Sequence, residues 1–234
     1  MISIVTGTLN RRHLLPDLLE NTVGDSELVE LILVDGGSTD GTIEYANSLK
    51  HDRVKFIEIG HRSKYAHFMG VGIESASYEY VCQWNDDVLL LGPWGRVIDV
   101  LKEPYDVFIF SWRQLGCSEP VDKDALVSRV DGWVLYNSDQ ECCLNFGVYK
   151  KDVFKKIGMY DSVFDYYYAD KDMADRSRAF GYRIRSCPEI KVLGLYELPK
   201  QARLVSEQLD YDNGRRNMAL YANNELPSTV KLLK

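Results

Sequence analysis

Long hydrophobic runs are absent from this sequence. The apolar runs around Val88–Leu91 and Val107–Phe110 are much shorter than the ~20 residues that a membrane-spanning helix needs. The apolar strand pattern already begins at Ile2, which leaves no room for a signal peptide. We therefore predict a cytoplasmic chain without a transmembrane segment.

Cysteine and histidine are scarce, and neither shows the spacing of a metal site. The five cysteines are odd in number, two of them are adjacent, and none forms a Cys-x-x-Cys pair. This pattern indicates neither a disulfide framework nor a zinc site, and idle thiols in a reducing compartment are the simplest interpretation. The four histidines also lack the spacing of metal ligands.

Positive charge is in the minority. Lys and Arg number 28 against 35 Asp and Glu, which gives a formal net charge of −7. A protein that holds nucleic acid needs clustered Lys and Arg to neutralise phosphates, so no nucleic-acid partner is expected. A nucleotide ligand is still compatible with this charge, because one phosphate pair needs only a few local donors or one metal ion.

Strand and helix signals alternate through the first half of the chain. Helical patterns, such as the one over Lys64–Ser77, separate short apolar runs that read as strands. Ser38 or Thr39 is expected to cap the helix that runs toward Leu49. The predicted strands are Ile2–Thr6, Leu28–Val34, Val54–Ile59 and Tyr78–Trp84. This alternation predicts an α/β fold, a nucleotide-binding sandwich with a mostly parallel central sheet.

The second half is less regular, and residues 113–141 read as a loop. A helix is expected from Asp170 to Phe180, with Gly181 at its end. Strands are predicted at Tyr105–Trp112, Cys143–Tyr149, Tyr182–Cys187 and Ile190–Leu195. Because no linker separates the halves, we predict one domain over 1–234. It comprises a first half (1–90), a second half (91–200) and a helical C-terminal tail (201–234).

Three polar clusters follow predicted strand ends: Thr6–Arg11, Asp35–Gly41 and Asn85–Asp87. Ligands of open parallel sheets bind at the carboxyl ends of the strands, so the clusters together indicate a nucleotide site. Asp35 can accept from a base N–H, and Gly36 permits close backbone approach. Backbone N–H groups near Gly7 and Thr8 can donate to phosphate oxygens. The alternative is that Asp35-Gly-Gly is only a turn.

Asp86 and Asp87 are adjacent carboxylates after a strand that should be buried. Such a pair repels unless a cation or a donor offsets it. Mg²⁺ and Mn²⁺ prefer carboxylate and phosphate oxygens, so one ion could bridge this site to a diphosphate. The alternative is a solvated turn.

Asp170 opens the late predicted helix, where the helix dipole and free N–H groups stabilise an anion. It could be merely a cap, or it could be a general base that takes the proton from an attacking hydroxyl. Asp172 and Arg176 are four residues apart and can pair along one helix face.

Taken together, these residues resemble family 2 glycosyltransferases with the GT-A fold, from Ile2 to about Tyr196. The most specific match is Asp35-Gly-Gly-Ser-Thr-Asp-Gly-Thr42, and the opening strand ends in Gly7-Thr-Leu-Asn10. Asn85 stands where the family has the first Asp of its Asp-x-Asp element. Ala169 replaces a frequent Glu, and the downstream metal-assisting His has no counterpart near Gly194–Tyr196.

The resemblance implies a role for each matching position. Asp35 would contact the uracil, Asp86 would face the ribose, and Asp87 would hold the metal. Asp170 would be the catalytic base. Lys64, in Lys64-Tyr-Ala, would contact the nucleotide, with Arg62 as a nearby alternative. The nucleotide-sugar-binding set is Thr6, Gly7, Thr8, Asn10, Arg11, Asp35, Gly36, Lys64 and Asp86. The first half (1–90) would thus bind the nucleotide sugar, and the second half (91–200) would bind the acceptor and carry the catalytic base.

The resulting prediction is an inverting glycosyltransferase that uses Mn(II) or Mg(II). It would move a glucose- or rhamnose-like hexose from a UDP-sugar to a hydroxyl of a glycan or glycoconjugate acceptor. The chain is also similar to glycosyltransferase domains of large algal viruses, which would place it in the host cytoplasm. The alternatives are a sugar nucleotidylyltransferase, although Thr6–Arg12 lacks the Gly-rich triphosphate loop, and a catalytically silent nucleotide-sugar-binding module.

Overall fold

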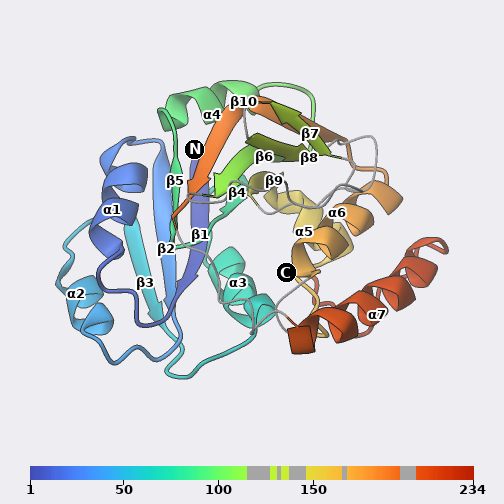
Figure 1. The fold of residues 1–234 in the computed structure, drawn as a ribbon, viewed down its shortest axis with the longest axis horizontal. Helices are drawn as coiled ribbons and strands as arrows, with labels where there is room; N and C mark the ends of the chain where they lie inside the picture. Colours follow the sequence, from blue (N-terminus) through green and yellow to red (C-terminus); the bar gives the residue numbers. More distant parts are fainter. Residues whose placement is uncertain (115–126, 131–132, 137–145, 165–167, 196–203) are drawn as a thin grey trace.

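A curled, mixed β-sheet with helices on both faces forms the body of the molecule (Figure 1). The computed structural model describes residues 1–114, 127–130, 133–136, 146–164, 168–195 and 204–234. The strand order along the sheet is β3-β2-β1-β4-β9-β6-β10-β5, and the strands β7 and β8 branch from β6. The prediction of a single α/β domain with this type of sandwich is confirmed.

The first four strands of the chain are parallel, as the alternating pattern predicts. They are β1 (Ile2–Thr8), β2 (Val29–Asp35), β3 (Val54–Glu58) and β4 (Tyr80–Gln83). The helices between them are α1 (Leu15–Leu19, continued by a π-helical turn over Glu20–Gly24), α2 (Thr42–Ser48) and α3 (Tyr65–Glu74). The carboxyl ends of β1, β2 and β4 therefore share one edge.

The second half of the chain makes the sheet mixed instead of mostly parallel. Strand β9 (Gly147–Lys150) lies antiparallel between β4 and β6 (Val107–Gln114). Strand β10 (Ile184–Gly194) runs parallel to β6 and antiparallel to β5 (Val88–Leu90). The insertion of β9 between β4 and β6 depends on pairing between residues far apart in the chain. The local sequence pattern therefore did not predict it.

Several local predictions for this half need correction. The antiparallel pair β7 (Val127–Val130) and β8 (Trp133–Tyr136) lies inside the segment predicted as a loop. The two strands predicted around residues 182–195 are one strand, β10, with an irregular register between Cys187 and Lys191. Residues 143–145 of another predicted strand lie outside the described residues. Helix α4 (Trp94–Val100) was not predicted.

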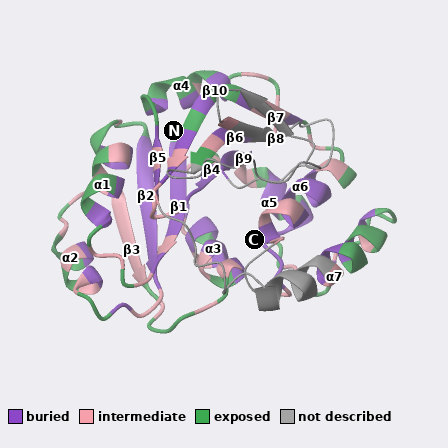
Figure 2. Cartoon of the chain, in the orientation of Figure 1, coloured by how far each residue is buried: buried purple, intermediate pink, exposed green. Residues whose placement is uncertain are grey.

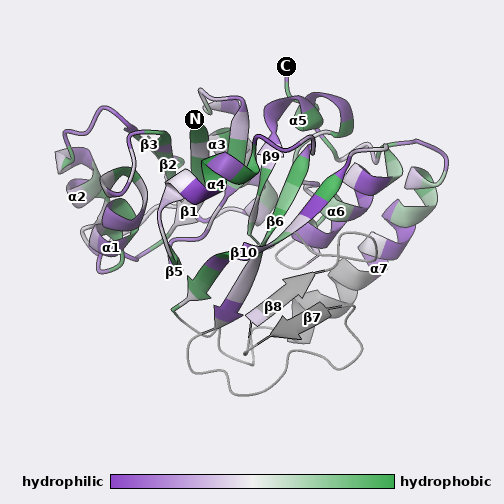
Figure 3. Ribbon diagram, turned by 90° about the horizontal axis from the view of Figure 1, so that it is seen from above, coloured by the Kyte–Doolittle hydropathy of each residue, from purple (hydrophilic) through white to green (hydrophobic). Residues whose placement is uncertain are grey.

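The remaining helices are α5 (Lys151–Ile157), α6 (Ala169–Ala179) and α7 (Leu204–Tyr221). Helix α6 agrees with the predicted helix, and Gly181 follows it with a φ of 81°. Figure 3 shows α7 at the edge of the molecule beside α6. No helix in the described part of the chain is long and apolar enough to cross a membrane.

Alternating strand residues feed two hydrophobic cores, one on each face of the sheet. Ile4 belongs to the core under α1 and α4, which also contains Trp94. Its neighbour Val5 belongs to the core under α3, α5 and α6, which also contains Met69 and Phe154. Figure 2 shows β1 and β2 buried between these layers. Burial on both faces explains why these strands read as continuous apolar runs.

Candidate active site

A cleft of about 530 Å³ lies where the carboxyl ends of the parallel strands meet the start of α6. Residues from all three predicted clusters line it, and so does the predicted base. The lining residues named in the sequence analysis as site candidates are Gly7, Thr8, Arg11, Gly36, Asp86, Asp87 and Asp170. Chain segments separated by more than 80 residues thus contribute to one cavity.

Asp86 and Asp87 sit side by side in the cleft; Asp86 has a polar neighbour from the last residue of β1, and Asp87 has one from the loop after β1. The Thr8 hydroxyl donates a hydrogen bond of 2.8 Å to Asp86 Oδ2, and Arg11 Nη1 lies 3.9 Å from Asp87 Oδ2. Burial raises the pKa of Asp86 to about 6; the Thr8 hydrogen bond opposes this rise, and the Asp87 charge adds to it. Burial also raises the pKa of Asp87, against the effect of Arg11.

These two carboxylates fit a divalent cation that arrives with a diphosphate. A cation would offset the desolvation that raises the pKa of both carboxyls, and also the repulsion by Asp87 that raises the pKa of Asp86. Among the described residues, no group of three or more His, Cys, Asp or Glu could hold a metal by itself. Mg²⁺ is commonly held by one or two carboxylates plus substrate phosphates and water, so two protein ligands suffice.

Asp35 lies below the cleft surface instead of lining it. Its side chain is fully buried, and Oδ1 accepts hydrogen bonds from the backbone N–H of Gly37 (2.8 Å) and Ser38 (2.9 Å). The Ser38 hydroxyl donates to Oδ2. The carboxylate therefore fixes the turn at Gly36 and Gly37, here called the glycine turn. Contact of Asp35 with the uracil base stays a prediction.

Asn10 ties the loop after β1 to the same glycine turn. Its backbone N–H donates to Ser38 Oγ (2.8 Å), and its Oδ1 accepts from the Thr39 N–H (2.7 Å). Ser38 and Thr39 thus bind Asn10 instead of the first turn of α2. The prediction that one of them caps that helix is wrong: Gly41 precedes it, and Asp40 Oδ1 accepts the Thr42 N–H at 3.1 Å.

Asp35→Ala is expected to weaken UDP binding equally in Mn²⁺ and in chelator. The substitution removes the carboxylate that fixes the glycine turn, and it removes the proposed hydrogen-bond acceptor for the uracil. Isothermal titration with UDP under both conditions would measure this. Asp40→Ala is the matched control: it removes a carboxylate from the same loop, where its bonds serve α2 and the Arg12 N–H. Unchanged UDP affinity in Asp35→Ala would refute the pyrimidine-site assignment.

Two further predicted residues lie outside the cleft. Thr6 is fully buried, and its hydroxyl donates to the Gly7 carbonyl oxygen at 3.1 Å. Lys64 precedes α3, with Nζ 3.5 Å from the Ser162 carbonyl oxygen. Arg62, the alternative to Lys64, does line the cleft.

The sequence reasoning missed the aromatic and amide walls of the cleft, formed by Tyr65, Phe68, Gln83, Trp112 and Phe146. Tyr65 follows Lys64 in the Lys64-Tyr-Ala motif, so that motif could have indicated it. Phe68 explains the glycine at position 7, where an added Cβ would lie 2.6 Å from its ring. Phe146 and Trp112 carried no local signal, since both come from the irregularly patterned half.

Asp170 stands in the first turn of α6, half-buried at the cleft. Burial raises the pKa of this carboxyl, and the backbone N–H of Lys171 and its own N–H partly oppose that rise. A raised pKa makes the carboxylate a better proton acceptor near neutral pH.

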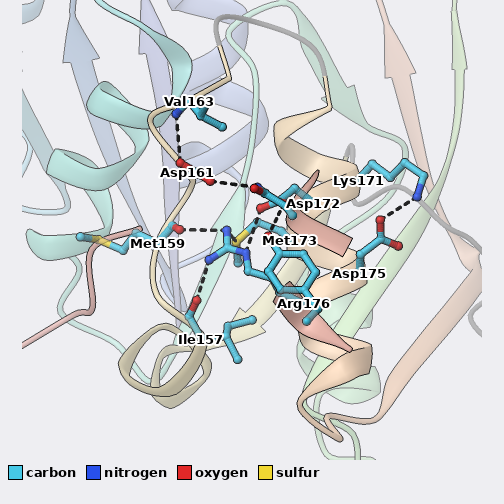
Figure 4. A network of polar contacts seen from close by, with 11 residues as sticks. Ile157, Met159, Asp161, Val163, Lys171, Asp172, Met173, Asp175 and Arg176 are labelled. Atoms are coloured by element: carbon cyan, nitrogen blue, oxygen red, sulfur yellow. Dashed lines mark hydrogen bonds and ion pairs between the residues drawn. The ribbon is translucent and has the colours of Figure 1, made fainter. Parts of the chain in front are cut away.

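Asp172 is almost fully buried, and its interactions are structural. The Nε of Arg176 donates to Asp172 Oδ2 at 2.8 Å, which confirms the predicted pair. Figure 4 shows Arg176 also reaching the carbonyl oxygens of Ile157 (2.6 Å) and Met159 (2.9 Å). The pair therefore joins α6 to the segment after α5.

Asp172→Asn is expected to cost about 3–5 kcal/mol of unfolding free energy, because it leaves the buried Arg176 guanidinium without its counter-ion. Urea denaturation would measure the loss. In the protein that remains folded, turnover should fall less than in Asp170→Asn. Asp152→Asn, at an exposed ion pair with Lys155, is the control and should cost little. Equal stability of the two variants would contradict the assignment.

Comparisons with known proteins identify a family and similar folds. The sequence model of glycosyl transferase family 2 matches residues 3–158. The mannosyltransferase PcManGT from Pyrobaculum calidifontis, in complex with GDP-Man and Mn²⁺, has a similar structure: the TM-score is 0.58 and the identity 15%, over 94% of this chain and 62% of that one. TarS 1–349 from S. aureus, in complex with UDP-GlcNAc, gives a TM-score of 0.72 and 14% identity, over 96% and 67%.

At these identities the likeness concerns the fold. This chain spans about 62% of the mannosyltransferase's length. No curated protein matches the sequence.

Proposed function

The chain belongs to glycosyl transferase family 2, and we propose that it is a glycosyltransferase that moves a hexose from a UDP-sugar to an acceptor hydroxyl with inversion. The acceptor would be a glycan or glycoconjugate, and the hexose would resemble glucose or rhamnose. One observation carries the proposal: Asp87 and Asp170, from opposite halves of the chain, line the same cleft. This observation supports a role for Asp87 as a metal ligand and a separate role for Asp170 as the carboxylate base.

The nucleotide would occupy the part of the cleft formed by the ends of β1 and β2. Gly36 and the backbone around Gly7 and Thr8 allow close approach there. Arg11 and Arg62 both line the cleft, and their guanidinium groups can bind phosphate oxygens. A mannosyltransferase bound to GDP-Man and Mn²⁺ and TarS bound to UDP-GlcNAc share the fold, which supports a nucleotide-sugar donor.

The reaction is a single displacement at the anomeric carbon. The acceptor oxygen forms the new bond to this carbon as its proton passes to the Asp170 carboxylate. The bond from the anomeric carbon to the diphosphate oxygen breaks, and its electron pair leaves with the diphosphate. Arg11 and Arg62 offset the charge that develops on this leaving group. Attack from the side opposite the diphosphate inverts the anomeric configuration.

Asp87, with Asp86 beside it, would hold a divalent ion in this cleft. When bound, Mn²⁺ or Mg²⁺ supplies electrostatic stabilisation of the leaving diphosphate.

Thermal unfolding with a panel of nucleotide sugars, each with and without Mn²⁺, tests the donor class. A ligand that binds the native state raises the unfolding temperature, and UDP-sugars should do so more strongly in Mn²⁺. Product analysis then separates the alternatives. Release of free UDP supports transfer, pyrophosphate would indicate nucleotidyl transfer, and neither product would indicate a silent binding module.

A further inference from the structure

The C-terminal helix α7 lies against α6, the helix whose first turn contains the proposed base (Figure 1). Both helices come after residue 158, where the match to the family ends. Two kinds of contact join them: a buried hydrogen-bond network and a close steric contact. Each contact reaches a residue within two positions of Asp170.

Asn217 of α7 is the centre of the buried network. Its Nδ2 donates to Asp172 Oδ1 and to Asp161 Oδ2, both at 3.0 Å. The Tyr221 hydroxyl donates to the same oxygen of Asp172. The four side chains are at most 6% exposed, so bulk solvent hardly reaches these carboxylates. Figure 4 shows that Asp161 and Asp172 lie close together beside Arg176. The network therefore fixes the first turns of α6 relative to α7.

Gly214 of α7 makes the steric contact with Tyr168, the residue that precedes α6. A Cβ added at Gly214 would lie 2.8 Å from Tyr168 Cδ1, which is too close for an undisturbed ring. Tyr168 has a left-handed backbone with a φ of 64°, and Asp170 follows two residues later. A non-glycine residue keeps such a backbone only when its surroundings hold it, and α7 supplies part of those surroundings.

We propose that α7 positions the Asp170 carboxylate for proton transfer, with Gly214 and Asn217 as its positioning residues. The inference rests on the proposed function, because it assigns these residues a role in the same reaction. A general base must keep its geometry to within a fraction of an ångström, and misplacement by about 1 Å can cost ~10²-fold in rate. Contacts at both Tyr168 and Asp172 hold the intervening turn from two sides.

Gly214→Ala is the decisive variant. Alanine has a higher helix propensity than glycine, so if Gly214 served only the stability of α7, the substitution should not destabilise this helix. The added methyl group should instead displace Tyr168 and lower kcat by about 10- to 100-fold. The donor Kd should stay unchanged, since donor-binding residues lie in the other half of the cleft. Gly95→Ala in α4 is the matched control, because its added Cβ meets no atom within 4 Å.

Asn217→Leu keeps the approximate shape but removes both hydrogen bonds, and Met218→Ala alters the exposed neighbouring residue as its control. Hydrogen exchange at the amides of residues 169–172 should accelerate in Asn217→Leu and stay unchanged in Met218→Ala. This readout is independent of activity.

The outcomes separate this inference from the proposed function. Wild-type kcat in Gly214→Ala, beside a large loss in Asp170→Asn, would overturn the positioning role and leave the proposed function intact. Undisturbed exchange at residues 169–172 in folded Asn217→Leu would overturn it as well. Normal turnover in Asp170→Asn would instead remove the general base itself, which is a failure of the proposed function.

Discussion

Asp170→Asn is expected to lower turnover by about 10²–10⁴-fold, the usual contribution of general-base catalysis. The amide keeps the shape of the side chain but cannot take up the proton of the attacking hydroxyl group. Donor affinity should barely change, because Asp170 lies at the start of α6 and the nucleotide cluster follows β1, β2 and β4. Steady-state kinetics at saturating donor and acceptor would measure the effect.

Asp175→Asn is the matched control for this prediction. Asp175 is on the same helix, does not line the cleft and binds Lys171 Nζ at 2.6 Å, so its loss should change turnover only slightly. A general base should also give a pH–rate profile whose acidic limb disappears in Asp170→Asn. Near-normal turnover in a folded Asp170→Asn protein would remove Asp170 from the mechanism.

Asp87→Asn is expected to weaken UDP binding in Mn²⁺ by about 10²-fold or more, since even residues that only orient metal ligands cost 10–100-fold. In chelator the same substitution should have a small effect, because UDP then binds without an ion. The raised pKa of Asp87 indicates that its charge lacks sufficient compensation from Arg11 alone. A bound cation would supply that compensation.

Isothermal titration of UDP in Mn²⁺ and in chelator provides the measurement. Asp99→Asn, at a surface ion pair with Lys102, is the control and should bind UDP like the unmodified protein. An equal loss of affinity under both conditions would show that Asp87 does not act through a metal. The ion pair between Asp87 and Arg11, at 3.9 Å, would then be the contact through which Asp87 affects UDP binding.

The parallel part of the sheet and the polar clusters at its edge could be predicted from the amino-acid sequence. Ile2–Thr8 and Val29–Asp35 are buried apolar strands, so their periodicity is strong, and the polar residues after them interrupt it. Asp86, Asp87 and Asp170 were predicted from residue type and position, and the structure brings them to one cleft. Local patterns suffice here because strand ends and helix starts are local features.

Which candidate residues line the cleft, and which support it from below, depends on the three-dimensional packing. Asp35 and Asn10 bind the glycine turn, and Arg62 lines the cleft where Lys64 does not. Trp112 and Phe146 meet through the antiparallel pairing of β6 and β9. This strand pairing joins residues that are far apart in the chain, and so does the contact of α7 with Tyr168. The hydrophobic periodicity of a single segment therefore cannot predict either contact. The reason is physical: these contacts are selected by the packing of distant surfaces, whereas helix and strand signals reflect neighbours along the chain.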